Sequence, residues 1–219
     1  MAMAVTARRT KLSVAQRSFH TFNATADARI KTLCQTNRLQ VAVEAFKHLL
    51  SAKSKSIPSL VTCILLLSSL VRWNQYASAL SEYRLMVKGD IFLDLITLNV
   101  VINCHCQTGR MDYAFRVFDG MEAHGYLPNV VTFSTVIKGL HRKGKFHEAF
   151  GLLSIMLQNG HKPNTITFNI LMDQLCKDGK LQEAMELLVQ MSNEGSNPDV
   201  FTFNFLIDGL RKQGKLDKG

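Results

Sequence analysis

The sequence predicts an all-α fold, a solenoid of antiparallel helix-turn-helix repeats. The first observation is a period of 35 residues, because residues 95–129, 130–164 and 165–199 align end to end without a gap. The second is that residue types return at fixed places in each unit: Gly109, Gly144, Gly179 and Gly214; Ala114, Ala149 and Ala184; Thr97, Thr132, Thr167 and Thr202; Pro128, Pro163 and Pro198. A period in the range of roughly 20 to 50 residues indicates stacked units that bury one another's apolar faces.

The composition fits such an array. Hydrophobic residues make up 47% of the 219 positions, which supports burial. The longest apolar run begins at Leu60 and is far shorter than the ~20 residues needed to span a bilayer, so we expect a soluble protein without membrane insertion. The net charge of +9 includes four cations before Phe19, so the array itself is only mildly basic. This balance permits a nucleic-acid partner without proving one.

The five cysteines do not form a disulfide pattern. Cys34, Cys106 and Cys176 occupy equivalent places in their units, which indicates packing of a small side chain. Cys104 and Cys106 flank a histidine, but residues two apart on a helix do not face each other. We therefore expect reduced thiols and neither a metal nor a cofactor.

Residues 1–22 are predicted to be an organellar transit peptide. They are rich in Ala, Arg, Ser and Thr and contain no acid, which is typical of a basic amphipathic leader. The dense arginines near the start favour a mitochondrion over a plastid. A disordered basic tail is the alternative.

Residues 23–59 form a degenerate first repeat, and residues 60–94 form a second one that is closer to the later units. The second keeps Thr62 but has Asn74 where glycine recurs and Ile64 where a polar residue recurs. Departures of this kind are expected near the end of an array.

Each regular unit contains two helices, as residues 130–164 illustrate. Phe133, Val136, Ile137 and Leu140 follow the i, i+3, i+4, i+7 spacing of one helical face. Gly144 can adopt the left-handed conformation that ends the helix. A second apolar face follows at Phe146, Ala149, Phe150 and Leu153, and we expect the small alanine to allow close approach of the two helices.

Residues 200–219 repeat the first helix and the turn and then stop, so they form a truncated repeat. The apolar face that includes Phe203 and Ile207 would lack its hairpin partner. Arrays normally end in a polar cap. We expect a truncated product or part of a longer protein.

Several segments together resemble the pentatricopeptide repeat family, in its plain class made of 35-residue units. They are Val130-Val-Thr-Phe-Ser-Thr-Val-Ile-Lys-Gly-Leu, Gly144-Lys-Phe-His-Glu-Ala and Gly160-His-Lys-Pro-Asn164, with close counterparts in the neighbouring units. The resemblance is strong over residues 95–219 and fair over 60–94. The overall style of the sequence, including the basic leader, resembles the restorer-of-fertility-like members of plants. The resemblance implies a right-handed superhelix that binds single-stranded RNA in an organelle, at one base per repeat, and acts in RNA processing or stability.

The family reads each base with a polar residue on the first helix and the last residue of the repeat. The resemblance places these roles on three pairs and one unpaired residue: Asn99 with Asn129, Ser134 with Asn164, Asn169 with Asp199, and Asn204. A carboxylate only accepts hydrogen bonds and so suits the N3–H of uracil, whereas an amide can donate to N3 of cytosine. By the family pattern the three pairs prefer C, A and U in the 5′ to 3′ direction.

The resemblance implies two further sets of contacts. Aliphatic or aromatic residues near the start of each first helix would sandwich the bases: Val61, Ile96, Val131, Ile166 and Phe201. Cations before the turn would lie near phosphates: Arg142, Lys177 and Lys212, with Gln107 interrupting the series. Such contacts make binding sensitive to salt without specifying sequence.

Each assignment has a structural alternative. Asn129, Asn164 and Asp199 could be N-caps of the following helices, since Asn and Asp are preferred there. The row that includes Val131 could be interface packing, and the cations could be solvated charges at helix C-termini.

We do not expect an enzyme. No phosphate-binding glycine loop or catalytic set recurs, and the His-x-Glu and Cys-x-x-Cys signature of deaminase domains is missing from the chain. The main alternative to RNA binding is a protein-binding scaffold similar to tetratricopeptide arrays, which have a period of ~34 residues. A truncated product without autonomous function is the third.

Overall fold

The computed structural model describes residues 24–51, 58–91 and 93–214, and all regular elements within these ranges are α-helices. Their bounds are α2 (Ala24–Gln35), α3 (Leu39–Ser51), α4 (Leu60–Arg72), α5 (Tyr76–Lys88), α6 (Leu95–Gln107), α7 (Met111–Ala123), α8 (Val130–Arg142), α9 (Phe146–Gln158), α10 (Thr165–Lys177), α11 (Leu181–Asn193) and α12 (Val200–Lys212). From α4 onward the first helix of a pair begins 35 residues after the previous one. The helix starts therefore follow the sequence period. The transit peptide predicted at residues 1–22 lies outside the described residues.

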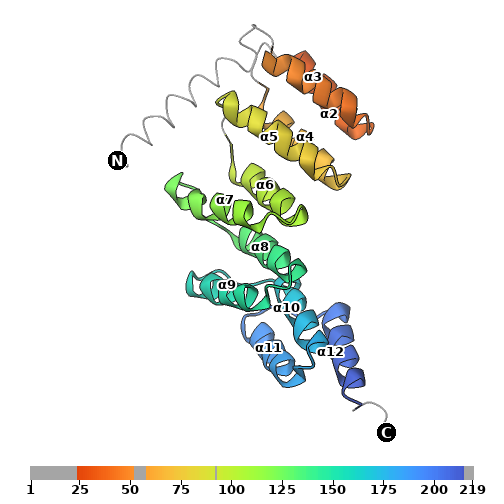
Figure 1. The fold of residues 1–219 in the computed structure, drawn as a ribbon, viewed down its shortest axis with the longest axis vertical. Helices are drawn as coiled ribbons and strands as arrows, with labels where there is room; N and C mark the ends of the chain where they lie inside the picture. The colour runs from red at the N-terminus through yellow and green to blue at the C-terminus, as the bar shows by residue number, and fades with distance from the viewer. Residues whose placement is uncertain (1–23, 52–57, 92, 215–219) are drawn as a thin grey trace. The chain divides into compact units, whose positions relative to one another are not determined.

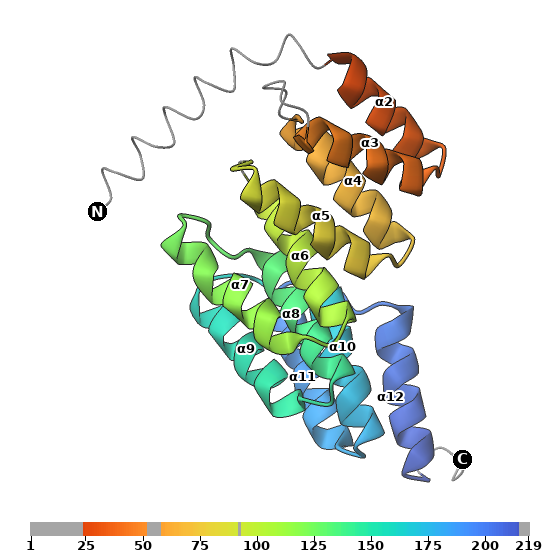
Figure 2. The ribbon, with the colours of Figure 1, turned by 45° about the horizontal axis from the view of Figure 1, so that its top comes forward.

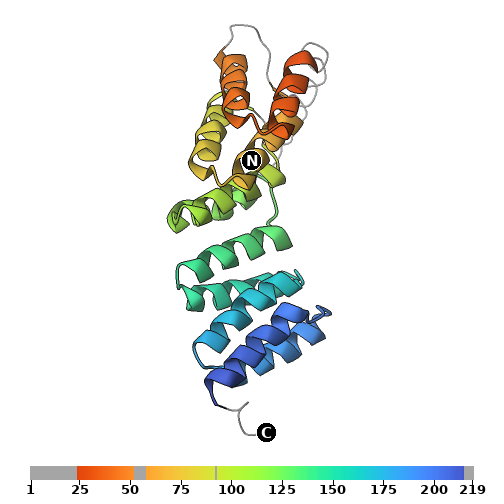
Figure 3. The ribbon, with the colours of Figure 1, turned by 90° about the vertical axis from the view of Figure 1, so that its right-hand side faces the viewer.

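The chain divides into two units, residues 1–104 and 105–219, which we call unit 1 and unit 2. In unit 1, α2 packs against α3 and α4, and α4 packs against α5 (Figure 1). In unit 2, α8 packs against α9 and α10, and α10 packs against α11 and α12 (Figures 2 and 3). The first helices α2 and α4 therefore lie side by side in unit 1, as do α8, α10 and α12 in unit 2.

The turn inside each hairpin depends on one residue with a left-handed backbone. Gly144 has φ +70°, and its equivalents Gly109, Gly179 and Gly214 have φ between +63° and +75°. In the first two hairpins this place is taken by Asn37 and Asn74, with φ +59° and +57°. Asparagine tolerates this conformation better than most side chains, so the hairpin persists where the glycine pattern does not.

Small residues allow the helices to approach one another. The recurring alanine of each second helix is fully buried, as at Ala149 and Ala184. A second close approach joins successive first helices, where Cys106 lies against Gly139 and Cys176 lies against Gly209. The described cysteines are all buried, so the predicted packing role of the recurring thiols is confirmed.

The last described helix has an exposed apolar face. Phe203 is 51% exposed, whereas the equivalent Phe133 is 1% exposed. The reason is packing: α8 contacts α7, α9 and α10, while the contacts of α12 with described helices are to α10 and α11. No helix in the described part of the chain is long and apolar enough to cross a bilayer.

Candidate nucleic-acid interface

A buried threonine organises the start of each first helix in unit 2. Thr132, Thr167 and Thr202 are fully buried. The backbone N–H group of each threonine donates to the side-chain oxygen of the residue three positions earlier, at 2.9–3.0 Å: Thr132 to Asn129, Thr167 to Asn164, and Thr202 to Asp199. The N-cap alternative for these three residues is therefore confirmed. An N-cap role leaves other polar atoms of the same side chain available, so it does not compete with base reading.

One predicted reading pair is in direct contact. Asn169, the fifth residue of α10, donates from Nδ2 to Asp199 Oδ1 at 2.9 Å. The hydroxyl of Thr202 lies 2.6 Å from Asn169 Oδ1 and donates to it. Asn169 is buried, while Asp199 is exposed. The amide therefore fixes the orientation of the carboxylate, and the carboxylate faces solvent.

A second predicted pair, Ser134 with Asn164, is linked through Thr167, which belongs to the next helix, α10. Ser134 Oγ lies 2.7 Å from Thr167 Oγ1, and Thr167 Oγ1 donates to Asn164 Oδ1 at 2.9 Å. Ser134 also donates to the carbonyl oxygen of Val130 at 2.6 Å. The structure thus brings the fifth and last residues of this repeat together, with the buried threonine between them. The sequence identified the threonine only as a marker of the period.

The other predicted readers, Asn99, Asn129 and Asn204, hold the corresponding places in their own repeats. Asn99 is half-buried on α6 in unit 1, and Asn129 caps α8 in unit 2. Asn204 is exposed on α12.

The predicted stacking residues are all exposed. Exposed fractions run from 55% to 64% for Val61, Ile96, Val131, Ile166 and Phe201. Each is the second residue of its helix. All except Val61 stand three positions before a predicted reader, so the two side chains are neighbours on one helical face. The alternative of interface packing is wrong for the described chain, because packed side chains would be buried.

The predicted phosphate contacts are exposed cations at the ends of the same helices. Arg142 donates from Nη1 to Gln107 Oε1, and Lys177 pairs with Asp173 at 2.6 Å. Lys212 is exposed at the end of α12. Gln107 stands where the other first helices from α4 onward have a cation, and it accepts a hydrogen bond from Arg142, the cation of the next repeat. Arg72 occupies the same place in α4 and is exposed, but sequence reasoning did not assign it.

These side chains form a stripe along each first helix, which we call the A-helix face. It comprises the second, fifth, ninth and thirteenth residues of the helix, for example Ile166, Asn169, Asp173 and Lys177 in α10. Residues three and four apart share one side of a helix. Because α8, α10 and α12 lie side by side in unit 2, their stripes are adjacent. Each stripe has an apolar second residue, a polar fifth residue and a cationic thirteenth residue, whereas the ninth is a lysine in α8 and an aspartate in α10 and α12.

Two titratable groups on or beside this face are shifted. The backbone N–H of Thr202 and the amide of Asn169 hold the pKa of Asp199 below its usual value. Burial lowers the pKa of His141, although Asp173 at 3.6 Å acts in the opposite direction. At neutral pH Asp199 is therefore a charged hydrogen-bond acceptor and His141 is neutral.

The sequence model of the PPR repeat family matches residues 93–142, 128–177 and 163–212, which together make up more than half of the chain. The chain belongs to the pentatricopeptide repeat (PPR) family. Its repeats are therefore distinct in sequence class from the tetratricopeptide arrays considered as an alternative.

Two PPR proteins of Arabidopsis thaliana are similar in sequence. The pentatricopeptide repeat-containing protein At4g19440, chloroplastic, is 35% identical over 82 residues, which are 37% of this chain and 9% of that protein. The pentatricopeptide repeat-containing protein At2g16880 is 32% identical over 98 residues, which are 43% of this chain and 13% of that protein. The PPR chain therefore corresponds to a small part of the length of both relatives.

Solved PPR structures share its fold. The crystal structure of PPR10 in complex with an 18-nt psaJ RNA element superposes with a TM-score of 0.73 and 26% identity, over 93% of this chain and 30% of PPR10. The Arabidopsis thaliana nuclear protein-only RNase P 2 superposes with a TM-score of 0.72 at 14% identity, over 86% of this chain and 42% of that one, which is a likeness of fold alone. Together with the helical hairpins, these likenesses confirm the predicted all-α superhelical repeat class.

Proposed function

We propose that this PPR chain binds single-stranded RNA along the A-helix faces of its repeats, at about one base per repeat. The observation that carries the proposal is the row of exposed apolar residues that recurs every 35 residues, including Val131 and Ile166. Water-exposed apolar side chains repeated beside polar pairs fit a ligand made of repeated flat, polar-edged units. PPR10, a structural relative, is in complex with RNA.

In this proposal the polar pairs form hydrogen bonds with the edges of the bases. Asp199 accepts hydrogen bonds only, so a pyrimidine whose N3 carries a hydrogen suits it, which favours uracil. Asn129 can donate to N3 of cytosine, and the pair of Ser134 with Asn164 follows the family pattern for adenine. The proposed readout of the three regular repeats is C, A and U, with a further base at Asn204.

The cations supply the contact with the RNA backbone. Arg142, Lys177 and Lys212 end the first helices of three successive hairpins. Lys177 also pairs with Asp173, so a phosphate at this place would compete with that carboxylate. We expect modest affinity that depends strongly on salt.

The proposed setting is an organelle, where the chain acts in post-transcriptional processing or stability of a transcript without catalysing a reaction itself. The basic, acid-free composition of residues 1–22 supports import, and its arginines favour the mitochondrion. One relative bears the name chloroplastic, which keeps the plastid as the alternative. A fluorescent reporter fused to residues 1–22 should enter mitochondria, and a reporter that stays in the cytosol would refute import.

A binding titration tests the function. Fluorescence anisotropy should show that a short single-stranded RNA containing the triplet CAU binds more tightly than its duplex. The logarithm of the affinity should fall with the logarithm of salt concentration by about 0.7 per phosphate contact. Absence of RNA binding even in dilute buffer would contradict the proposal.

A further inference from the structure

Trp73 is the only tryptophan of the chain and lies in the turn between α4 and α5. Its backbone N–H donates to the carbonyl oxygen of Ser69 at 3.3 Å, and Asn74 then reverses the chain. The turn is therefore fixed, yet the indole remains 52% exposed. A large aromatic face held at the surface is a platform on which a flat ring can stack.

The indole forms one wall of a hollow between the first two hairpins of unit 1. Its other apolar walls are Leu39 and Val41 at the start of α3. Its polar lining consists of one guanidinium and three carboxamides, from Arg38, Asn37, Gln40 and Gln75. The hollow has a volume of about 370 Å³, which is within the range of pockets that hold small molecules.

The lining has a particular chemistry. Carboxamides both donate and accept hydrogen bonds, and a guanidinium donates to anions. Among the described residues that line the hollow, none carries a carboxylate. A planar ring with donors and acceptors on its edge, attached to a negative phosphate, matches this set. An unpaired nucleotide has these properties, and stacking on an aromatic side chain tolerates every base.

The place of the hollow in the repeat supports the same ligand. Trp73 directly follows Arg72, which has the register of the proposed phosphate contacts Arg142 and Lys177. The same repeat has Ile64 at the fifth position of its first helix, which cannot hydrogen-bond a base edge. A nucleotide whose phosphate contacts Arg72 would therefore have no polar reader on the A-helix face of α4. The indole of Trp73, directly after Arg72, offers its base an aromatic surface instead.

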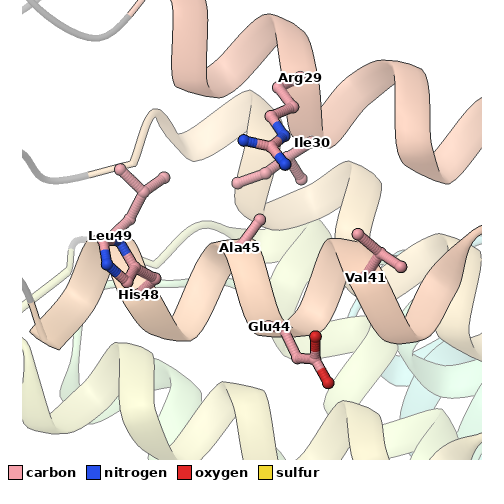
Figure 4. Close-up of a pocket in the computed structure, with 7 residues that line it drawn as sticks. All are labelled: Arg29, Ile30, Val41, Glu44, Ala45, His48 and Leu49. Carbon is pink, nitrogen blue, oxygen red and sulfur yellow. The ribbon is translucent and has the colours of Figure 1, made fainter.

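A second groove adjoins the hollow at Val41. It runs between α2 and α3 and is lined by Ile30, Ala45 and Leu49 (Figure 4). Arg29, Glu44 and His48 complete the lining of this groove, and the Arg29 guanidinium faces it (Figure 4). The extension of the hollow thus carries another cation, Arg29, together with one acid, Glu44.

We propose that the hollow of Trp73, Arg38 and Gln75 is an accessory RNA site that holds one unpaired base by stacking on the indole. This proposal rests on the proposed RNA-binding function. The site adds affinity without sequence selectivity at the repeat that lacks a polar reader.

The single tryptophan makes the test direct. A labelled single-stranded oligouridylate is titrated with the full chain, and tryptophan emission and RNA anisotropy are recorded together. Quenching of the emission should follow the same binding curve as the anisotropy. Trp73→Ala should weaken RNA binding by about fivefold, whereas Trp73→Phe should retain most of the affinity because the ring persists.

The control is Tyr113→Ala, which removes another half-exposed aromatic ring from unit 2 and should leave affinity and emission unchanged. RNA binding with unchanged emission, or with equal affinity of Trp73→Ala and the parent chain, would overturn the accessory site and leave the proposed function standing. No RNA binding by the parent chain would overturn both. Circular dichroism should show equal helix content in all variants.

Discussion

Asn169 donates a hydrogen bond from Nδ2 to Asp199 Oδ1 at 2.9 Å, so the fifth and last residues of one repeat act as a pair. An amide nitrogen carries two hydrogens and a carboxylate has two oxygens, so this bond uses only part of each group. The N-cap bond from Thr202 to Asp199 uses the same Oδ1. The exposed carboxylate keeps acceptor capacity while its orientation is fixed from two sides.

Asp199→Asn should move the preference at one base from uracil towards cytosine. Asparagine caps a helix about as well as aspartate, so stability should change little. The amide adds a donor that the carboxylate lacks, and one base contact of this kind is worth about 1 kcal/mol, or roughly fivefold in affinity. Anisotropy titrations of both proteins with RNAs that differ only in U or C at this base measure the change.

The matched control for this substitution is Asp119→Asn, which removes the same charge from an exposed place on the second helix α7, away from the A-helix face. It should alter affinity for both RNAs equally. Equal discrimination by Asp199→Asn and the parent chain would remove the base-reading role of Asp199.

Ile166→Ala should weaken RNA binding by about fivefold, because the proposal places this side chain against a base. Val189 in the same repeat is similarly exposed but lies on the second helix, α11, away from the A-helix face. Val189→Ala should therefore leave the affinity unchanged. Both residues are exposed, so thermal unfolding should be nearly the same for both variants. Equal losses of affinity would argue against a stacking row.

The sequence was sufficient to predict the hairpins because a repeated glycine and a repeated apolar spacing fix helix ends and buried faces. The capping role of Asn164 was predictable for the same local reason. The bond between Asn169 and Asp199 was not, because it depends on how one helix meets the next. Arg72 was missed since Gln107 interrupts the cation series, although the 35-residue register alone would have found it.

Gly139→Ala should destabilise the chain by about 1–3 kcal/mol, although alanine is the better helix former. A Cβ at this place would lie 2.5 Å from Cys106 Sγ and 2.8 Å from its Cβ. To remove this overlap, α8 would have to move away from the last turn of α6. Urea unfolding monitored by circular dichroism measures the loss.

Gly151→Ala is the matched control, because Gly151 also lies inside a helix but a Cβ there would meet nothing within 4 Å. It should raise stability by about 0.5–1 kcal/mol. Adding Cys106→Ala to Gly139→Ala should recover part of the loss, since it removes the sulfur. A stability gain from Gly139→Ala equal to that of Gly151→Ala would show that the helices do not approach closely here.

Glu82 is a buried acid where the regular repeats have apolar residues. It is 1% exposed, and the equivalent places hold Leu152 and Leu187. Lys47 Nζ lies 3.4 Å from Oε1, while buried Oε2 has no hydrogen-bond partner among the described residues. Burial raises the pKa of Glu82, and Lys47 opposes the rise only in part. The charged form is therefore disfavoured in the folded chain.

The sign of the pH dependence follows from this shift. Between the ordinary carboxyl pKa of 4.5 and the raised pKa of Glu82 in the fold, the folded chain holds more protons than the unfolded one. The free energy of unfolding must then fall as pH rises through this window and stay low above it. A buried carboxylate without a full set of partners thus costs stability at neutral pH.

Glu82→Leu should raise the free energy of unfolding at neutral pH by about 1 kcal/mol or more, because apolar replacements of buried ion pairs are often stabilising. The gain should shrink as pH falls below 4.5, where Glu82 is protonated in both states. Urea unfolding of both proteins at neutral pH and below pH 4.5 measures the gain in the free energy of unfolding. Glu44→Leu, at an exposed acid of α3, should change stability by less than about 0.5 kcal/mol at either pH. A loss of stability in Glu82→Leu at neutral pH would mean that the ion pair with Lys47 outweighs the burial of the charge.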